Sequence, residues 1–281
     1  MNSLTRHLVL ILALVCINQS VYAQVFYGEG FEPLEGVPSP DEFVPPIQYK
    51  RGNHSQPTNQ VLKDTQDAYV RKDYATILRL LRPFAEQGDA PTQSNLGYMY
   101  ANGQGVTKDD KEAARWYRLA AEQGYARAQT NLGYMYSNGQ GVTKDEKEAV
   151  RLYRLAAEQG DARAQFNLGT MYEKGLGVSQ DYKEAVRLYR LAAGQGYAAA
   201  QINLGVMYEK GLGVSQDHKE AVRLYRLAAA QGDARAQSNL GYMYHNGLGV
   251  GQDHEEAVRL YRLAAEQGYA AAQAYLQQFI P

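Results

Sequence analysis

Hydrophobic residues recur along the chain in two alternating patterns, each with the spacing of an amphipathic helix. In the first pattern, Leu96, Met99 and Tyr100 share one helical face, and Gly97 lies beside them. The second pattern follows the spacing i, i+4, i+7 and i+8, at Ala113, Tyr117, Ala120 and Ala121. These stripes predict a pair of helices that pack through small residues, with Tyr100 and Tyr117 filling the core between them.

The two patterns repeat along most of the chain. Glycines mark the period at a constant step of 36 residues, at positions 88, 124, 160, 196, 232 and 268. A period of about 20 to 50 residues is typical of a solenoid, in which each unit packs on its neighbours. We therefore predict an all-α solenoid over 61–281, with an N-terminal cap pair at 61–87, a C-terminal cap helix at 268–281, and five repeats at about 88–123, 124–159, 160–195, 196–231 and 232–267.

Local signals set the helix ends. Asp109 can accept hydrogen bonds from the free backbone N–H groups that follow it, and Glu112, three residues later, completes a capping box. Gly124 suits the left-handed residue that ends the second helix, and Gly103 and Gly105 give similar freedom after the first. Because these signals recur, every repeat is predicted to be a helix hairpin.

The repeated phrase resembles a known family. "NLGYMYANGQGV" followed by "DDKEAARWYRLAAEQG" is similar to the Sel-1-like repeat, a relative of the tetratricopeptide repeat, and the resemblance extends from Gly88 to the C-terminus. It implies a right-handed superhelix of antiparallel helix pairs whose first helices line the concave side. It also implies a role as an adaptor that holds protein complexes together.

Comparison of the five copies with one another separates fixed positions from variable ones. In the first helix, four variable positions spaced 3, 4 and 3 residues apart form one stripe, which the resemblance places on the concave face. From this stripe we expect partner contacts by Arg127, Arg163, Arg235, Tyr98, Tyr134, Phe166, Ile202, Val206 and Tyr242. An exposed apolar centre at Phe166, Ile202 and Val206 would favour protein recognition, whereas drift on a solvated face is the alternative explanation.

One asparagine beside this stripe is the same in all five repeats, at Asn95, Asn131, Asn167, Asn203 and Asn239. A side-chain amide both donates and accepts hydrogen bonds, so this ladder is a candidate for holding the backbone of an extended peptide. The resemblance to tetratricopeptide modules implies the same use. A hydrogen bond from each amide to the neighbouring helix is the alternative, and the sequence leaves both open.

The first residues have the pattern of an export signal. An apolar run from Leu8 to Ile17 is too short to span a bilayer, and it is followed by a small-x-small cleavage pattern that ends at Ala23. We predict a signal peptide at 1–23, a proline-rich disordered linker at 24–60, and a periplasmic or secreted mature protein. Because Cys16 is the only cysteine, cleavage would leave no disulfide, thiolate metal site or cysteine nucleophile.

The net charge, the histidines and the regularity of the repeats exclude several classes of function. A formal net charge of -1 gives no basic surface for nucleic acid. His218 and His254 occupy equivalent positions one repeat apart, too distant to share a metal ion, so we expect surface histidines. No repeat departs from the pattern by placing an acid, base or nucleophile in it, so we expect no catalytic, cofactor-binding or metal site.

The resulting prediction is an exported, non-enzymatic scaffold, monomeric and without a membrane span, that binds a protein or peptide partner in its groove. Two other functions stay open. One is a hydrolase acting on cell-wall peptides or β-lactams, an activity suggested for cysteine-rich relatives of the repeat. The other is a structural spacer that presents the N-terminal arm.

Overall fold

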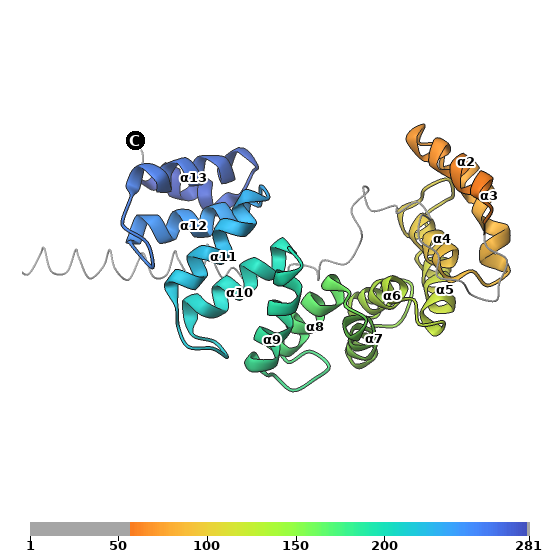
Figure 1. Cartoon of the computed structure of the whole chain (residues 1–281), viewed down its shortest axis with the longest axis horizontal. Coiled ribbons are helices and arrows are strands. Elements are labelled where there is room, and N and C mark those ends of the chain that lie inside the picture. Colours follow the sequence, from red (N-terminus) through yellow and green to blue (C-terminus); the bar gives the residue numbers. More distant parts are fainter. Residues whose placement is uncertain (1–56, 280–281) are drawn as a thin grey trace, which may run out of the picture. The chain divides into compact units, whose positions relative to one another are not determined.

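The computed structural model describes residues 57–279, which form thirteen helices and, within that range, no strand. The helices are α2 (Asn59–Val70), α3 (Tyr74–Glu86), α4 (Ala90–Asn102), α5 (Asp110–Glu122), α6 (Ala126–Asn138), α7 (Glu146–Glu158), α8 (Ala162–Lys174), α9 (Tyr182–Gly194), α10 (Ala198–Lys210), α11 (His218–Ala230), α12 (Ala234–Asn246), α13 (His254–Glu266) and α14 (Ala270–Phe279). From α4 to α13, first and second helices alternate, so the predicted all-α solenoid of antiparallel helix pairs is confirmed. The predicted signal peptide and nearly all of the predicted linker lie outside the described residues (Figure 1).

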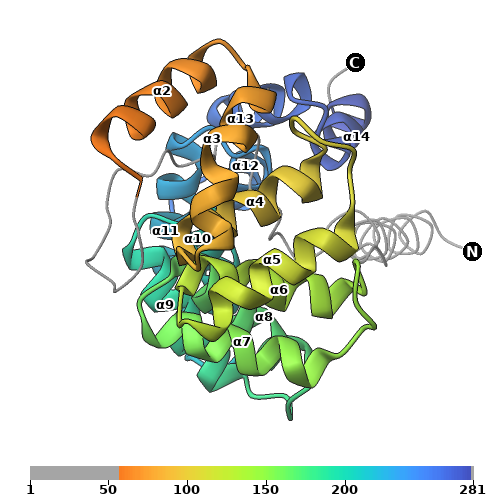
Figure 2. The ribbon, with the colours of Figure 1, turned by 90° about the vertical axis from the view of Figure 1, so that its right-hand side faces the viewer.

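The described residues belong to two compact units, one ending at Ser215 and one beginning at Gln216. The first unit contains α2 to α10, and the second contains α11 to α14. In each unit a helix packs on the next one along the chain, for example α4 on α5 and α5 on α6, which lie side by side in Figures 1 and 2. Among the described residues, no helix combines the length and the apolar character that a membrane crossing needs.

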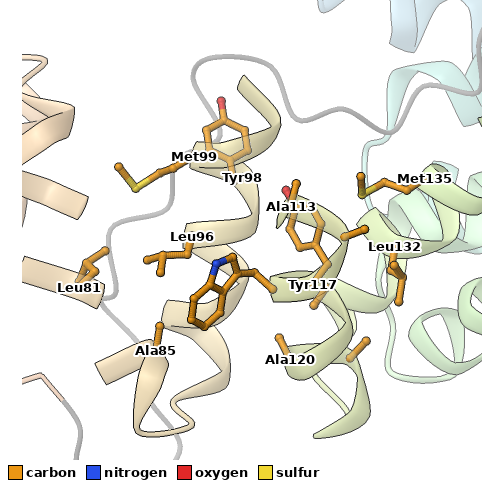
Figure 3. Packing of buried hydrophobic residues seen from close by; sticks show 14 of the residues in the cluster. Leu81, Ala85, Leu96, Tyr98, Met99, Ala113, Tyr117, Ala120, Leu132 and Met135 are labelled. Atoms are coloured by element: carbon orange, nitrogen blue, oxygen red, sulfur yellow. The ribbon is translucent and has the colours of Figure 1, made fainter. Parts of the chain in front are cut away.

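The core of the hairpins α4–α5, α6–α7 and α8–α9 contains a tyrosine ring packed on a glycine. A Cβ atom added to Gly97 would stand 2.7 Å from the Tyr117 ring, and Gly133 and Gly169 face Tyr153 and Tyr189 in the same way. The space left by the absent Cβ therefore receives an aromatic ring rather than a second backbone. Tyr117 is buried, as predicted, in a cluster that fills the space between α3, α4, α5 and α6 (Figure 3).

Tyr100 packs against the edge of this core but is not buried in it, contrary to the prediction. Its side chain is half-buried, and its hydroxyl accepts a hydrogen bond from Arg82 Nη2 at 2.9 Å. The same contact, from an arginine of one hairpin to a tyrosine of the next, recurs within the units as Arg118–Tyr136, Arg154–Tyr172, Arg190–Tyr208 and Arg226–Tyr244. This second tyrosine thus links consecutive repeats at the surface.

The second helix begins at its aspartate, but the capping box is only half formed. Asp109 Oδ1 accepts from the N–H groups of Lys111 and Glu112 at 2.9 and 3.0 Å. The Glu112 carboxylate instead pairs with Arg115, and the Asp109 N–H donates to the Tyr100 carbonyl at 3.0 Å. The last turn of α4 supplies this acceptor, so the reciprocal bond from Glu112 is replaced.

Each glycine that marks the 36-residue period is followed by a residue that alternates between Asp and Tyr along the chain. This residue directly precedes the first helix of its repeat. Asp161 caps α8 by accepting from the Ala164 N–H at 2.8 Å. Tyr197 replaces that carboxylate with a ring that packs against Phe166, with ring centroids 5.3 Å apart. Alternate repeats therefore stabilise the start of the first helix by hydrogen bonding or by burial.

Consecutive hairpins are also joined by a glutamine ladder. Gln129 is buried, and its Nε2 donates to the Ala121 carbonyl of the preceding helix at 3.2 Å. Its Oε1 accepts from Gln159 Nε2 at 2.8 Å, and the pairs Gln123–Gln93 and Gln195–Gln165 repeat this contact. Because each buried amide is satisfied across a helix junction, the ladder fixes the register of one hairpin on the next.

Candidate functional site

Most residues predicted to contact a partner are buried in the packing between helices. Phe166 and Ile202 expose 6% and 0% of their surface, and Tyr98 and Tyr134 are also buried. Of the expected apolar centre, only Val206 is partly exposed. The expectation that Phe166, Ile202 and Val206 form one exposed apolar surface is wrong, because two of the three side chains belong to the core.

Compensation of size explains why these positions vary. The position of Phe166 and the position four residues later carry the pairs Ser94/Tyr98, Thr130/Tyr134, Phe166/Thr170, Ile202/Val206 and Ser238/Tyr242. Residues i and i+4 share a helix face, and each pair combines a small with a large side chain or two of medium size. In α8 the Phe166 ring lies 5.7 Å from the Tyr189 ring, centroid to centroid. The variation is therefore a set of alternative packings with similar total volume.

The asparagine ladder lies at the junction between hairpins. Four of its members are buried, and Asn203 is half-buried; the buried ones are Asn95, Asn131, Asn167 and Asn239. Asn203 Nδ2 donates to the Tyr189 hydroxyl at 3.2 Å, which joins α10 to α9. This contact favours a structural role, the alternative that the sequence left open. A role of the ladder in holding a peptide stays a prediction.

Asn203 takes part in a three-residue arrangement that we call the tyrosine cluster. It consists of the last variable residue of a first helix, the buried tyrosine of the second helix and the asparagine of the next first helix. In the third repeat these residues are Glu173, Tyr189 and Asn203. The Tyr189 hydroxyl donates to Glu173 Oε2 at 2.5 Å and lies 3.1 Å from Thr170 Oγ1.

The environment of Tyr189 determines what this cluster can do chemically. Burial, together with the Glu173 carboxylate, raises the pKa of Tyr189 well above its usual value. The hydroxyl therefore stays protonated at neutral pH and acts as a hydrogen-bond donor, not as a nucleophile or base. The cluster links α8, α9 and α10 through polar contacts inside the packing.

The remaining predicted contact residues keep part of their surface exposed; they are Arg127, Arg163, Arg235, Val206 and Tyr242. Burial raises the pKa of Tyr117, and the positive charges of Arg127 and Arg163 oppose that rise. The accessible part of the predicted stripe is thus more basic and less apolar than expected.

A second surface, which the sequence analysis did not identify, lies between consecutive second helices. A pocket of about 420 Å³ is lined by residues of α7, α8 and α9, among them Leu188 and Leu191. A pocket of about 280 Å³ is lined by the residues 36 positions earlier, among them Leu155. Leu155 and Leu191 are 37% and 44% exposed. The sequence signal for this surface is a leucine next to Arg154, outside the buried stripe.

Charged side chains of both signs surround each pocket. At the larger one, Arg187 pairs with Glu184 at 2.6 Å, and Arg154 donates to the Tyr172 hydroxyl at 3.2 Å. Glu158 on the same rim is exposed. Each pocket therefore combines leucine side chains with charged side chains that can contact polar groups of either charge.

Comparison with solved structures identifies the fold. The Sel1 repeat protein from Oxalobacter formigenes is 37% identical to this chain, with a TM-score of 0.71 over 76% of this chain and 85% of that one. The protective antigen c5321 of uropathogenic Escherichia coli, which displays an SLR fold, is also 37% identical, with a TM-score of 0.69 over 77% of this chain and 50% of that one. The chain therefore matches about half the length of c5321. The immunity protein Pa5087 from Pseudomonas aeruginosa, at 20% identity and a TM-score of 0.51, shares the fold alone.

The repeats themselves identify the family. No curated protein sequence matches the chain significantly. Five consecutive segments match the Sel1 repeat, at residues 90–125, 126–161, 162–197, 198–233 and 234–269. The chain belongs to the Sel1 repeat family, whose solenoids typically mediate protein–protein interactions.

Proposed function

We propose that this chain is an exported scaffold that binds a protein partner and catalyses no reaction itself. The two equivalent pockets with their exposed leucines, Leu155 and Leu191, carry the proposal. Apolar side chains in pockets with charged rims are suited to receive an anchor residue of a partner. Export rests on the sequence pattern of residues 1–23.

The partner that fits this surface is a protein segment with two apolar anchor residues and charged residues beside them. The two pockets have equivalent linings one repeat apart, so one kind of anchor suits both. A segment that fills both pockets binds its second anchor intramolecularly, which raises its overall affinity. Exposed Glu158 and the Glu184–Arg187 pair offer contacts to charged groups of either sign.

The first-helix groove is the second candidate surface. Its accessible members in the first unit include Arg127, Arg163 and Val206, and the family resemblance places them on the concave side. Two partly exposed arginines at equivalent positions of neighbouring repeats favour an acidic peptide as the ligand of this face. The variable stripe therefore still contributes to the proposal, through its charged residues instead of its apolar ones.

A role without catalysis is supported by the state of Tyr189, the strongest catalytic candidate in the tyrosine cluster of the third repeat. Its raised pKa disfavours the phenolate that a nucleophile or general base requires. The hydrolase alternative predicts turnover of peptidoglycan fragments or β-lactams by the purified chain. The proposal would be contradicted by hydrolysis that persists in Tyr189→Phe and is lost in another variant, because a catalytic centre would then lie elsewhere in the chain.

Site-specific photocrosslinking in the producing cell tests which surface binds. A photoreactive residue at position 155 or 191 should capture the same protein, and Leu191→Ser should abolish capture from position 155. Lys147→Ser, an exposed change on α7 that lines neither pocket, is the matched control and should leave capture unchanged. Capture only from positions 127 and 163 would assign binding to the first-helix groove, and capture from neither surface would refute the proposal.

A further inference from the structure

Two histidines meet in the C-terminal unit, and one of them, His254, was expected to be a surface residue. His245 lies in the last turn of α12, and His254 is the first residue of α13. Their Nδ1 atoms are 3.1 Å apart, and their ring centroids are 4.8 Å apart. His254 therefore meets His245 across the loop, and not its equivalent His218 one repeat away.

Tyr275 of α14 brings a third polar atom to the same point. Its hydroxyl lies 2.5 Å from His245 Nδ1. Tyr275 stands 36 residues after Asn239, so it occupies the asparagine position of the repeat. Its ring stacks on Tyr261, with centroids 3.9 Å apart and planes inclined by 22°. The fifth repeat thus has its own version of the tyrosine cluster, with a histidine where the third repeat has Glu173.

Two polar atoms lie within hydrogen-bonding distance of His245 Nδ1, which is more than one ring nitrogen can satisfy. A ring nitrogen carries either one proton or one in-plane lone pair, so it satisfies one hydrogen bond. Here both His254 Nδ1 and the Tyr275 hydroxyl approach it. A cation between the three groups resolves the conflict, because each group then contributes its own lone pair.

The spacing of the two nitrogens suits a metal ion. At metal–nitrogen distances of about 2.0–2.1 Å, two ligands 3.1 Å apart subtend roughly 100° at the ion, within the range of a tetrahedral site. The Tyr275 hydroxyl is closer to His245 than two ligands of one ion stand, so binding moves it outward by a few tenths of an ångström. His254 is exposed, which leaves the remaining coordination positions open to water.

We propose that His245, His254 and Tyr275 form a binding site for one divalent transition-metal ion of the zinc and copper class. Imidazole nitrogens favour these ions over magnesium and calcium, which prefer carboxylate and carbonyl oxygens. Within residues 57–279, no three His, Cys, Asp or Glu side chains gather at one point, so the site consists of two imidazoles and a phenol.

The protonation state of the site agrees with this assignment. Burial, and then the neighbouring His254, lower the pKa of His245 below its usual value. The lower pKa disfavours the protonated imidazole, which cannot bind a metal ion. A bound ion would connect α12, α13 and α14, and so stabilise the C-terminal end of the solenoid against unfolding.

Calorimetric titration of the full chain, free of any histidine tag, with Zn²⁺ tests the site. His245→Gln and His254→Gln should each lose one bound ion relative to the unmodified chain, and Tyr275→Phe should weaken binding about tenfold. His218→Gln, which removes a histidine from the same position of the preceding repeat, is the matched control and should bind like the unmodified chain. The Cu²⁺ form should show two coupled nitrogens by electron paramagnetic resonance.

Two results would overturn the proposal. One is unchanged Zn²⁺ binding in His254→Gln, and the other is loss of the same ion in His218→Gln. Because His254 is exposed, its replacement leaves the packing intact, and thermal unfolding without metal verifies this. In the unmodified chain Zn²⁺ should raise the melting temperature, and the rise should disappear in His254→Gln.

Discussion

In the second and third repeats the equivalent tyrosine packs on the equivalent glycine, but its hydroxyl has different surroundings in the two repeats. Tyr153 and Tyr189 are both fully buried, on Gly133 and Gly169. The Tyr153 hydroxyl lies near Ser137 but has no hydrogen-bond partner of good geometry among the described residues. The Tyr189 hydroxyl has three polar neighbours, at Thr170, Glu173 and Asn203.

This difference separates two roles of the tyrosine. The ring is fixed by the same packing in both repeats, whereas two of the three neighbours of the Tyr189 hydroxyl, Thr170 and Glu173, come from variable positions of the first helix. A buried polar group without a partner costs about 1–3 kcal/mol, so the third repeat gains stability at a point where the second does not. The variable residues therefore adjust the local stability of each hairpin inside a common core.

Alkaline pH should destabilise the folded chain through the buried tyrosines that the repeats share. This is the largest expected effect on the free energy of unfolding. Burial raises the pKa values of Tyr117, Tyr153, Tyr189 and Tyr261 above the usual value of about 10. Above that pH the unfolded chain releases protons that the folded chain retains, so the stabilisation, complete below about pH 10, is lost as the pH rises. The slope is about -1.4 kcal/mol per pH unit for each tyrosine.

Urea unfolding between pH 8 and pH 11 measures this loss. Replacing Tyr153 and Tyr189 together by Phe should make the decline less steep, because two of the four groups no longer titrate. Phenolate absorbance from the buried tyrosines should appear only as the chain unfolds. A free energy of unfolding that stays constant from pH 9 to pH 11 would show that the rings are accessible to solvent.

Replacing the Phe166/Thr170 pair of the third repeat by the Thr/Tyr pair of the second should have the next largest effect on stability. Phe166→Thr removes a buried ring from the third repeat and should cost about 3 kcal/mol, because the small residue leaves a cavity beside Tyr189. Thr170→Tyr alone should also destabilise, by about 1–3 kcal/mol, through overpacking. The double variant restores the Thr/Tyr pair found at Thr130 and Tyr134 and should recover most of the loss.

A double-mutant cycle in urea measures the coupling between these two positions. A favourable interaction energy of 1 kcal/mol or more would show that the pair varies as a unit. Additive losses would mean that size compensation does not explain the variation, and the stripe would then need another cause. Thr143→Ser, an exposed loop change in the preceding repeat, is the control and should leave the midpoint unchanged.

The fold could be predicted because its determinants are local and repeated. A period of 36 residues, an aspartate before each second helix and a glycine after each helix specify the hairpins without any long-range contact. Gly103 has a φ of 67° at the end of α4, as its position in the sequence predicts. The roles of Tyr100 and Tyr117 could not be separated in this way, since Arg82 meets Tyr100 from the preceding hairpin.

The surfaces were harder to predict, because they depend on how hairpins pack on one another. Variation at Phe166 indicated release from packing, but a buried position also varies when its neighbour at i+4 compensates. The pockets at Leu155 and Leu191 exist only once consecutive second helices are placed side by side. His245 and His254 approach each other because the loop between them folds back, with Gly247 and Gly249 at positive φ.

Removing the two hydroxyls one at a time is the smallest and most direct test of the difference between the repeats. Tyr189→Phe leaves Glu173 and Asn203 without their common partner and should lower the free energy of unfolding by about 1–2 kcal/mol. Tyr153→Phe keeps the ring and removes a hydroxyl that has no partner among the described residues, so it should change stability by less than about 0.5 kcal/mol or increase it. Urea unfolding at pH 7 compares the two variants directly, since each retains the same ring on the same glycine. Equal losses would mean that the Tyr153 hydroxyl is hydrogen-bonded in solution, and that the second and third repeats satisfy their tyrosines equally well by different partners.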